Sequence, residues 1–204
     1  MAGLQFEAST HTYTLDGKEI PSVTEICAPL TAGKYPPAGV VDAAAARGTR
    51  VHELCALYDM DALPEQFEGD LLPYLQAWAS FCRDYRPQWE YIEHCMSGEL
   101  DGDPLAGTAD RIGVIDGRRV VVDIKTAQSL DRPAKVALGC QLAGYAILAR
   151  CNGMDLFDPG LGVQLLKNGS YRVYEEKKLG EKYGFHSHHV FCALRLLHKI
   201  TKGK

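Results

Sequence analysis

Two aspartates and a lysine lie close together in the segment GTADRIGVIDGRRVVVDIKT, residues 107–126. Its Asp116-Gly117 dipeptide strongly favours a two-residue hairpin loop between extended strands. With that loop, Asp110 faces Asp123 across the strands, with Cβ atoms roughly 5 Å apart. Lys125 shares their face, because side chains alternate along a strand. A loop of three residues would instead separate the two aspartates.

This grouping of charges suits phosphodiester hydrolysis with a divalent cation. Two carboxylates so close together repel, and one of them is pushed towards protonation unless a cation lies between them. Mg²⁺ and Mn²⁺ prefer carboxylate, carbonyl and water oxygens as ligands. The Lys125 ammonium can then orient or deprotonate a water, or stabilise charge on a phosphate. The alternative is a surface hairpin whose Asp and Lys residues form ordinary salt bridges.

The hairpin carries apolar residues on both faces. The aspartate face continues with Ile112, Val114 and Val121, and the opposite face carries Ile115, Val120, Val122 and Ile124. Strands that are apolar on both faces are buried on both, so we expect this hairpin at the centre of a sheet. The carboxylates would then lie at one end of a partly buried surface.

The rest of the chain predicts one α/β domain with a mixed sheet. Strands are expected at 11–20 (a hairpin around Asp16-Gly17), 89–96, 161–166 and 170–177, and helices at about 41–59, 68–84, 134–150 and 187–200. Ser22 and Glu25 fit a helix capping box, and residues 97–103, SGELDGD, are expected to form a polar turn. A single α/β layer structure is the simplest architecture for this order of elements.

Composition favours a soluble globular protein. The 204 residues are 46% apolar and 24% charged, which is enough for one sizeable core. No apolar run approaches the roughly 20 residues of a membrane span. The first ten residues also lack the features of a secretory signal. The seven cysteines include no C-x-x-C pair. We therefore expect a cytoplasmic protein with reduced, mostly buried thiols.

Charge is distributed unevenly along the chain. Residues 165–204 hold 9 Lys and Arg against 3 Asp and Glu, whereas the first 164 residues hold 13 against 23. A basic tail after an acidic body fits a polyanionic partner, and it fits a solvated C-terminal helix equally well. Candidates for phosphate contacts are Arg50, Arg111, Lys135 and the cluster 177–182, with solvated surface charge as the alternative for each.

Four segments together resemble the PD-(D/E)XK nuclease superfamily, and most closely its RecB-like and phage-type exonucleases. In chain order they are RGTRVH at 47–52, GTADR at 107–111, DIKT at 123–126 and QLAGY at 141–145. The N-terminal HTYTLDGKEIPSVTEI is similar to the opening of many phage-encoded members. The order and separation of the segments agree with the family pattern, whereas the last fifty residues match none of its motifs.

The resemblance implies a metal site. Asp110 and Asp123 would ligate the metal together with the backbone carbonyl of Ile124 and the imidazole of His52. Lys125 would be the catalytic lysine. The cofactor would be Mg²⁺ or Mn²⁺. No iron–sulfur cluster is expected, because the C-terminal cysteine cluster of some members is missing from this sequence.

The resemblance also implies DNA contacts. Gln141 and Tyr145 match a pair that contacts DNA near the cleavage site, and their i, i+4 spacing puts both on one helix face. From spacing alone, Tyr145 is explained equally well as a core residue. Thr126 and Arg50 are further candidates for DNA contact.

Two other polar features leave alternatives open. Many members carry an accessory glutamate before the first aspartate, for which Glu93 is preferred over Glu90. A group of histidines at 186–189 fits the polar start of a helix better than a metal site, because its spacing matches no common ligand pattern.

The implied fold is a restriction-endonuclease-like mixed central β-sheet flanked by helices. It forms one domain over residues 1–204, with an N-terminal hairpin at 11–20, a nuclease core at about 41–177 and a C-terminal helix at about 187–200. The implied function is an exonuclease that leaves 5′-phosphates, in phage-type recombination or DNA repair. A single-strand annealing protein and a homo-oligomer are candidate partners, and a membrane is not. The alternatives are a structure-specific endonuclease and a non-catalytic DNA-binding module.

Overall fold

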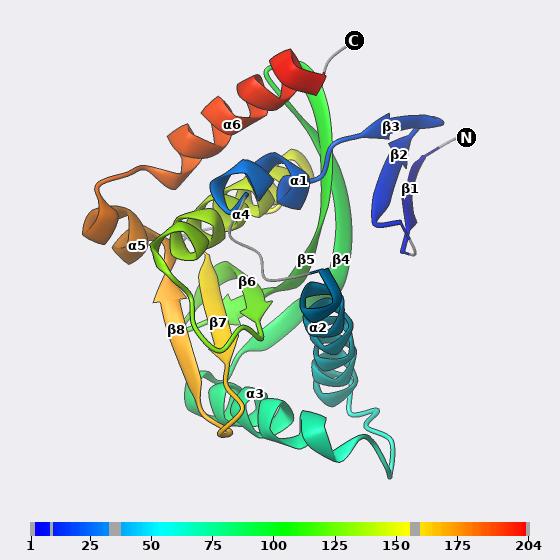
Figure 1. Ribbon diagram of the computed structural model, residues 1–204, viewed down its shortest axis with the longest axis vertical. Coiled ribbons are helices and arrows are strands. Elements are labelled where there is room, and N and C mark those ends of the chain that lie inside the picture. Colours follow the sequence, from blue (N-terminus) through cyan, green and yellow to red (C-terminus); the bar gives the residue numbers. More distant parts are fainter. Residues whose placement is uncertain (1–2, 9, 33–37, 156–159, 203–204) are drawn as a thin grey trace.

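The centre of the computed structural model, which describes residues 3–8, 10–32, 38–155 and 160–202, is a five-stranded mixed sheet (Figure 1). Its strands lie in the order β4 (Gln88–Leu100), β5 (Asp103–Ile115), β6 (Arg118–Lys125), β7 (Leu161–Leu165) and β8 (Tyr171–Glu175). Only β6 and β7 pair in parallel, and the helix α4 (Arg132–Cys151) makes the crossover that a parallel pair requires. The mixed α/β fold expected from the sequence is confirmed.

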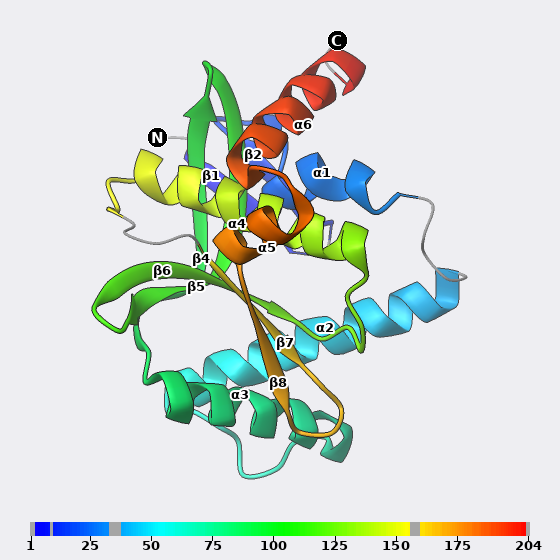
Figure 2. The same ribbon diagram turned by 90° about the vertical axis from the view of Figure 1, so that its left-hand side faces the viewer.

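Helices cover both faces of this sheet (Figure 2). One side carries α1 (Val23–Cys27), the 3-10 turn η1 (Ala28–Leu30), α4, α5 (Glu176–Tyr183) and α6 (Ser187–Lys202); the other carries α2 (Ala38–Asp59), η2 (Gly69–Leu71) and α3 (Leu72–Tyr85). Ile112 and Val121 belong to the core on the α4 side. Val120, Val122 and Ile124 belong to the core on the α2 and α3 side. The hairpin is therefore buried on both faces, as its sequence predicts.

The predicted register of the β5–β6 hairpin is confirmed. Ile115 pairs with Arg118, and the pairing continues to Arg111 with Val122. Asp116 and Gly117 have φ of 50° and 74°, the left-handed values that a two-residue hairpin loop of this type requires. The pairing ends there, one step before Asp110 and Asp123.

The segment SGELDGD is extended, against the expectation of a polar turn. Strand β4 continues to Leu100 and β5 begins at Asp103, so the turn is confined to Asp101 and Gly102. Gly98 has a packing role there, since a Cβ added to it would lie 2.7 Å from the Cys151 Cβ at the end of α4. Gly98 thus allows close approach of a helix within a strand.

Two elements lie outside the predicted set. Strand β1 (Leu4–Glu7) pairs with β2 (Thr12–Leu15), which with β3 (Lys18–Ile20) forms a separate three-stranded sheet. Helix α5 takes over the end of the segment expected as a strand up to residue 177. The helix buries Leu179, and Glu176 in its first turn and Lys182 in its last turn match the sign of the helix dipole.

The basic C-terminal helix is fastened to the acidic body. Lys199 Nζ lies 2.7 Å from Asp103 Oδ2, and Lys202 Nζ lies 2.5 Å from Glu25 Oε1. Ser22 Oγ accepts the backbone N–H of Glu25 at 3.0 Å, which is one half of the predicted capping box, whereas the Glu25 carboxylate pairs with Lys202 and His198. These basic groups of the tail are thus engaged within the molecule. Among the described residues, no helix combines the length and hydropathy needed to cross a membrane.

Candidate active site

The predicted catalytic residues meet where β5 and β6 stop pairing. Beyond the Arg111–Val122 pair, the carboxylate of Asp110 takes over the role of a backbone acceptor, because its Oδ2 accepts the N–H of Ile124 at 2.6 Å. Lys125 Nζ lies 2.8 Å from Asp123 Oδ2. Asp110 and Asp123 are only 8% and 3% exposed. The hairpin thus ends in two buried carboxylates and one ammonium.

Glu93 approaches this site from β4 with an unusual backbone. Strand β4 pairs Ile92 with Arg111 and His94 with Ala109, so Glu93 stands opposite Asp110. Its φ of 49° is left-handed in the middle of a strand. Such a conformation costs on the order of 1–3 kcal/mol and tends to occur at functional sites. A carboxylate oxygen of Glu93 lies within 4.8 Å of ligand atoms of Asp110 and His52.

His52 of α2 lies between two of the predicted metal ligands. Its Nδ1 is 3.3 Å from Asp110 Oδ1, and its Nε2 is 3.1 Å from the carbonyl oxygen of Ile124. Burial by itself lowers the pKa of this imidazole, but the charge of Asp110 and the hydrogen bond to it outweigh burial and raise the pKa to about 9. Both ring nitrogens face oxygen atoms, so His52 must give up a proton to ligate a cation.

The pKa values of the two aspartates are shifted in opposite directions. Burial raises the pKa of both carboxyls. For Asp110 the neighbouring His52 and the Ile124 N–H more than compensate, and its pKa is lowered. For Asp123, burial and the charge of Asp110 outweigh the Lys125 ammonium, and its pKa is raised. The repulsion between the two carboxylates that was expected from the sequence thus raises the pKa of Asp123.

The donor set fits a hard divalent cation. Ligand atoms of His52, Glu93 and Asp110 lie within 4.8 Å of one another. Asp123 Oδ2 is shielded from solvent and has no hydrogen bond of normal geometry, so only the ion pair with Lys125 balances it. The carboxylate and carbonyl oxygens of this set are the ligands that Mg²⁺ and Mn²⁺ prefer. A cation at this site would help to neutralise the buried negative charge of Asp123.

The four predicted DNA-contact residues occupy different environments. Gln141 is half-buried and, with Lys125, lines an open pocket of about 730 Å³ between α1 and the start of α4. The hydroxyl of Thr126 faces Gly48 of α2, where an added Cβ would lie 3.5 Å away. Arg50 is paired with Glu68 and Asp70 on the surface. These three side chains remain accessible to a ligand to different degrees.

Tyr145 is a core residue. It is 5% exposed, and its hydroxyl lies 3.5 Å from the Thr24 Oγ1. A Cβ added to Gly107 would lie 3.0 Å from the Tyr145 ring, so the glycine of GTADR lets α4 pack closely on β5. This burial favours the packing alternative for Tyr145.

Two of the phosphate-contact candidates are already engaged. Arg111 is fully buried, with its Nε 2.7 Å from Asp59 Oδ2 and its Nη1 3.0 Å from Glu93 Oε1. The prediction of a phosphate contact for Arg111 is therefore wrong. In the cluster 177–182, Lys178 pairs with Glu175.

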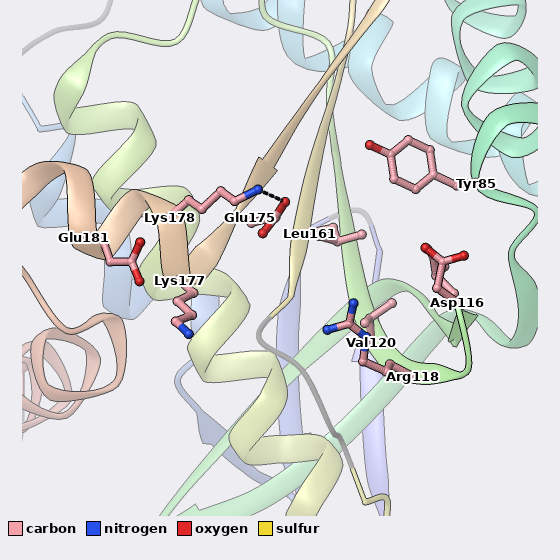
Figure 3. Close-up of a pocket in the computed structure, with 10 residues that line it drawn as sticks. Tyr85, Asp116, Arg118, Val120, Leu161, Glu175, Lys177, Lys178 and Glu181 are labelled. Atoms are coloured by element: carbon pink, nitrogen blue, oxygen red, sulfur yellow. Dashed lines mark hydrogen bonds and ion pairs between the residues drawn. The ribbon is translucent and has the colours of Figure 1, made fainter.

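That Lys178–Glu175 pair lines a different pocket, of about 360 Å³ (Figure 3). It lies beside the hairpin turn and α5, with Asp116 and Arg118 on its wall. Arg118 begins β6 and Lys125 ends it, so the pocket is about 20 Å from the catalytic residues along the strand. Charges of both signs line it, and none of the residues predicted for the metal site or for catalysis is among them.

Asp59 is the site-related residue that sequence reasoning missed. It follows His52 by seven residues, two helical turns, so both lie on the same face of α2. This spacing is the signal that could have linked Asp59 to the site. Glu90, the alternative accessory acid, pairs with Arg119 on the surface, with Arg119 Nε 2.7 Å from Glu90 Oε2.

Known proteins provide an independent comparison. No curated protein matches the chain. A solved structure described as "Crystal structure of SSO0001" is 19% identical over 80% of this chain and 72% of that chain, with a TM-score of 0.38, a likeness too weak to support a statement about this protein. The sequence model of the PD-(D/E)XK nuclease superfamily matches residues 32–183, well over half of the chain and including every segment that meets at the β5–β6 site. By this match the chain belongs to the PD-(D/E)XK nuclease superfamily, which implies a metal-dependent nuclease.

Proposed function

We propose that the protein is a Mg²⁺- or Mn²⁺-dependent deoxyribonuclease that degrades DNA from an end and leaves 5′-phosphates. The observation that carries the proposal is the meeting of Asp110, Asp123, Glu93, His52 and Lys125 at the open end of one hairpin. Superfamily membership supports the nuclease part. The preference for an exonuclease rests on the resemblance of the four sequence motifs to RecB-like and phage-type enzymes.

Each side chain then has a proposed role. Asp110, Asp123, the Ile124 carbonyl and His52 would hold the cation, with Glu93 as an accessory ligand. When bound, the cation supplies Lewis-acid stabilisation of charge at a phosphate. Lys125, whose pKa its partners Asp123 and Asp110 keep raised despite burial, stays protonated and presents an ammonium to the phosphate or orients the attacking water.

DNA would approach from the pocket between α1 and α4. Lys125 at its floor and Gln141 on its wall come from two different elements, β6 and α4. A substrate phosphate next to Lys125 would therefore lie within reach of the Gln141 amide. Tyr145 is proposed to support this wall from the core, where its ring packs beneath Gly107.

The test is release of acid-soluble nucleotides from linear double-stranded DNA in Mg²⁺, Mn²⁺ and EDTA. Asp123→Asn and Lys125→Ala are expected to abolish metal-dependent release. Asp116→Asn at the hairpin turn is the matched control, since asparagine also tolerates the left-handed backbone there. The nuclease proposal is wrong if the wild-type protein releases nothing in either metal and cuts neither linear nor circular DNA.

Covalently closed circles separate the exonuclease from the endonuclease alternative. An enzyme that needs an end leaves them intact, whereas cleavage of circles, or of branched DNA at one position, favours the endonuclease. A non-catalytic binding module would retain DNA affinity in EDTA and leave every strand whole.

A further inference from the structure

We propose that Arg111 is a positioning residue that fixes the metal site from behind the sheet, with Asp59 as its anchor. The inference rests on the proposed function, because it assumes that Glu93 and Asp110 face a bound cation. Arg111 follows Asp110 directly on β5, so its side chain points to the opposite face of the sheet.

The guanidinium joins three elements at the site. Its Nε donates to Asp59 at the end of α2, and its Nη1 donates to Glu93 Oε1 on β4 at 3.0 Å. Nη1 also donates to the backbone carbonyl of Asp110 at 2.5 Å. The carboxylate of Glu93 and the main chain of Asp110 are thus held by one rigid planar group.

The anchor of this group is itself fixed. The Trp78 indole Nε1 of α3 donates to both oxygens of Asp59, at 3.0 and 3.1 Å. The guanidinium also lies over the Trp78 ring, 5.4 Å from its centre. Asp59 and Arg111 are 2% and 0% exposed at their side chains. The Glu93 side chain, in contrast, is 39% exposed.

Stability alone does not explain this arrangement. A buried ion pair is often replaced by well-packed apolar residues without loss of stability. Glu93 holds a left-handed backbone within a strand, and the strand ladder gives way to side-chain bonds at Asp110. Both irregularities are in residues that Arg111 contacts through other atoms. The position of Arg111 is therefore that expected of a residue that holds Glu93 and Asp110 in place where regular strand pairing does not.

The test measures Mn²⁺ affinity by electron paramagnetic resonance of the free ion, with thermal unfolding recorded alongside. The central variant is the double change Asp59→Leu with Arg111→Met, which removes the buried pair as a unit. We expect it to remain folded while its Mn²⁺ dissociation constant rises about tenfold or more, as for other groups that orient metal ligands. The matched control is Glu90→Leu with Arg119→Met, which removes an exposed ion pair between β4 and β6 and should leave the Mn²⁺ affinity unchanged.

Arg111→Lys provides a second test that does not depend on the double variant folding. Lysine keeps the charge opposite Asp59 but cannot span all three acceptors, so a several-fold weaker affinity is expected. Because Arg111 would act through Glu93, adding Glu93→Gln to Arg111→Lys should weaken binding less than the two separate effects combined.

The outcomes distinguish the two proposals. Wild-type Mn²⁺ affinity in folded Arg111→Lys, or fully additive effects with Glu93→Gln, would overturn the positioning role. Mn²⁺ binding by the wild type without any DNA cleavage would refute the proposed function while the affinities still decide the role of Arg111. A wild type that binds no Mn²⁺ would overturn both.

Discussion

Two arginine–glutamate pairs link β4 to its neighbours in the sheet, and they differ in burial and in the number of partners. Near the hairpin turn, Arg119 binds Glu90 through two contacts of 2.7 and 3.0 Å, and both side chains are about one-third exposed. At the other end, Arg111 binds Glu93 and Asp59 and is fully buried. Exposed pairs contribute little because water competes for both partners, whereas a buried charge depends on its partners completely.

Strand geometry differs between the same two ends. At the turn the ladder is regular, and its left-handed residues are those that a two-residue loop demands. At the open end Glu93 is left-handed without a turn, and Asp110 bonds through its side chain. Local rules are kept where the hairpin only has to fold. These rules are broken where charged side chains from different helices and strands must meet, which is typical of functional sites.

The largest expected effect separates activity from stability at the open end. Asp123→Asn should reduce DNA cleavage by about three orders of magnitude, since a cation contributes several kcal/mol to the transition state. It should leave the free energy of unfolding almost unchanged. Burial and the nearby Asp110 charge raise the pKa of Asp123, so the ionised carboxylate adds little to stability. Cleavage assays and urea denaturation of the same samples measure both. A variant that loses stability and activity together would contradict the distinction.

The next prediction compares the two arginines directly. Arg111→Met should lower the free energy of unfolding by about 3–5 kcal/mol, because it leaves Asp59 charged and buried without its partner. Arg119→Met should lower it by less than about 1 kcal/mol. Urea denaturation of both variants is the measurement. Equal losses would mean that burial does not distinguish the pairs.

A smaller effect tests the two ends of the QLAGY segment. Gln141→Ala should raise KM for DNA about tenfold, about 1.4 kcal/mol, without altering stability, because the amide lines the pocket beside Lys125. Tyr145→Phe should leave KM unchanged, since its ring is buried. Steady-state kinetics on one DNA substrate provides both values. A raised KM for Tyr145→Phe alone would restore Tyr145 as a DNA contact.

The smallest effect concerns the exposed ion pair of Glu25 with Lys202. Burial raises the pKa of Glu25, but Lys202 and His198 outweigh it and hold the pKa below its ordinary value of 4.5. The pair therefore stabilises the folded state above pH 4.5, and its contribution is lost as the pH falls through the lower folded-state value. Glu25→Gln should cost less than about 1 kcal/mol at pH 7. Thermal unfolding across pH should show the gap closing below pH 4.5, and a gap that persists in acid would contradict this assignment.

Much of the fold was predictable because its signals are local. The Asp-Gly turns require left-handed backbone, and that requirement sets the register that carries Asp110 towards Asp123. Apolar residues on both faces of β6 required cover on both sides. The strand β1 and the helix α5 were not predicted. Each is short, and each depends on pairing or packing with another element, which the local sequence pattern does not show.

By itself, the sequence determined the hairpin, its register, the helices around it and the set of chemical groups at its open end. Only the tertiary structure decided which of these groups meet. It brought Glu93 to the site and left Glu90 at the surface, buried Arg111 against Asp59, and placed Tyr145 in the core. Each of these depends on burial and on distances between elements far apart in the chain, and local periodicity carries neither.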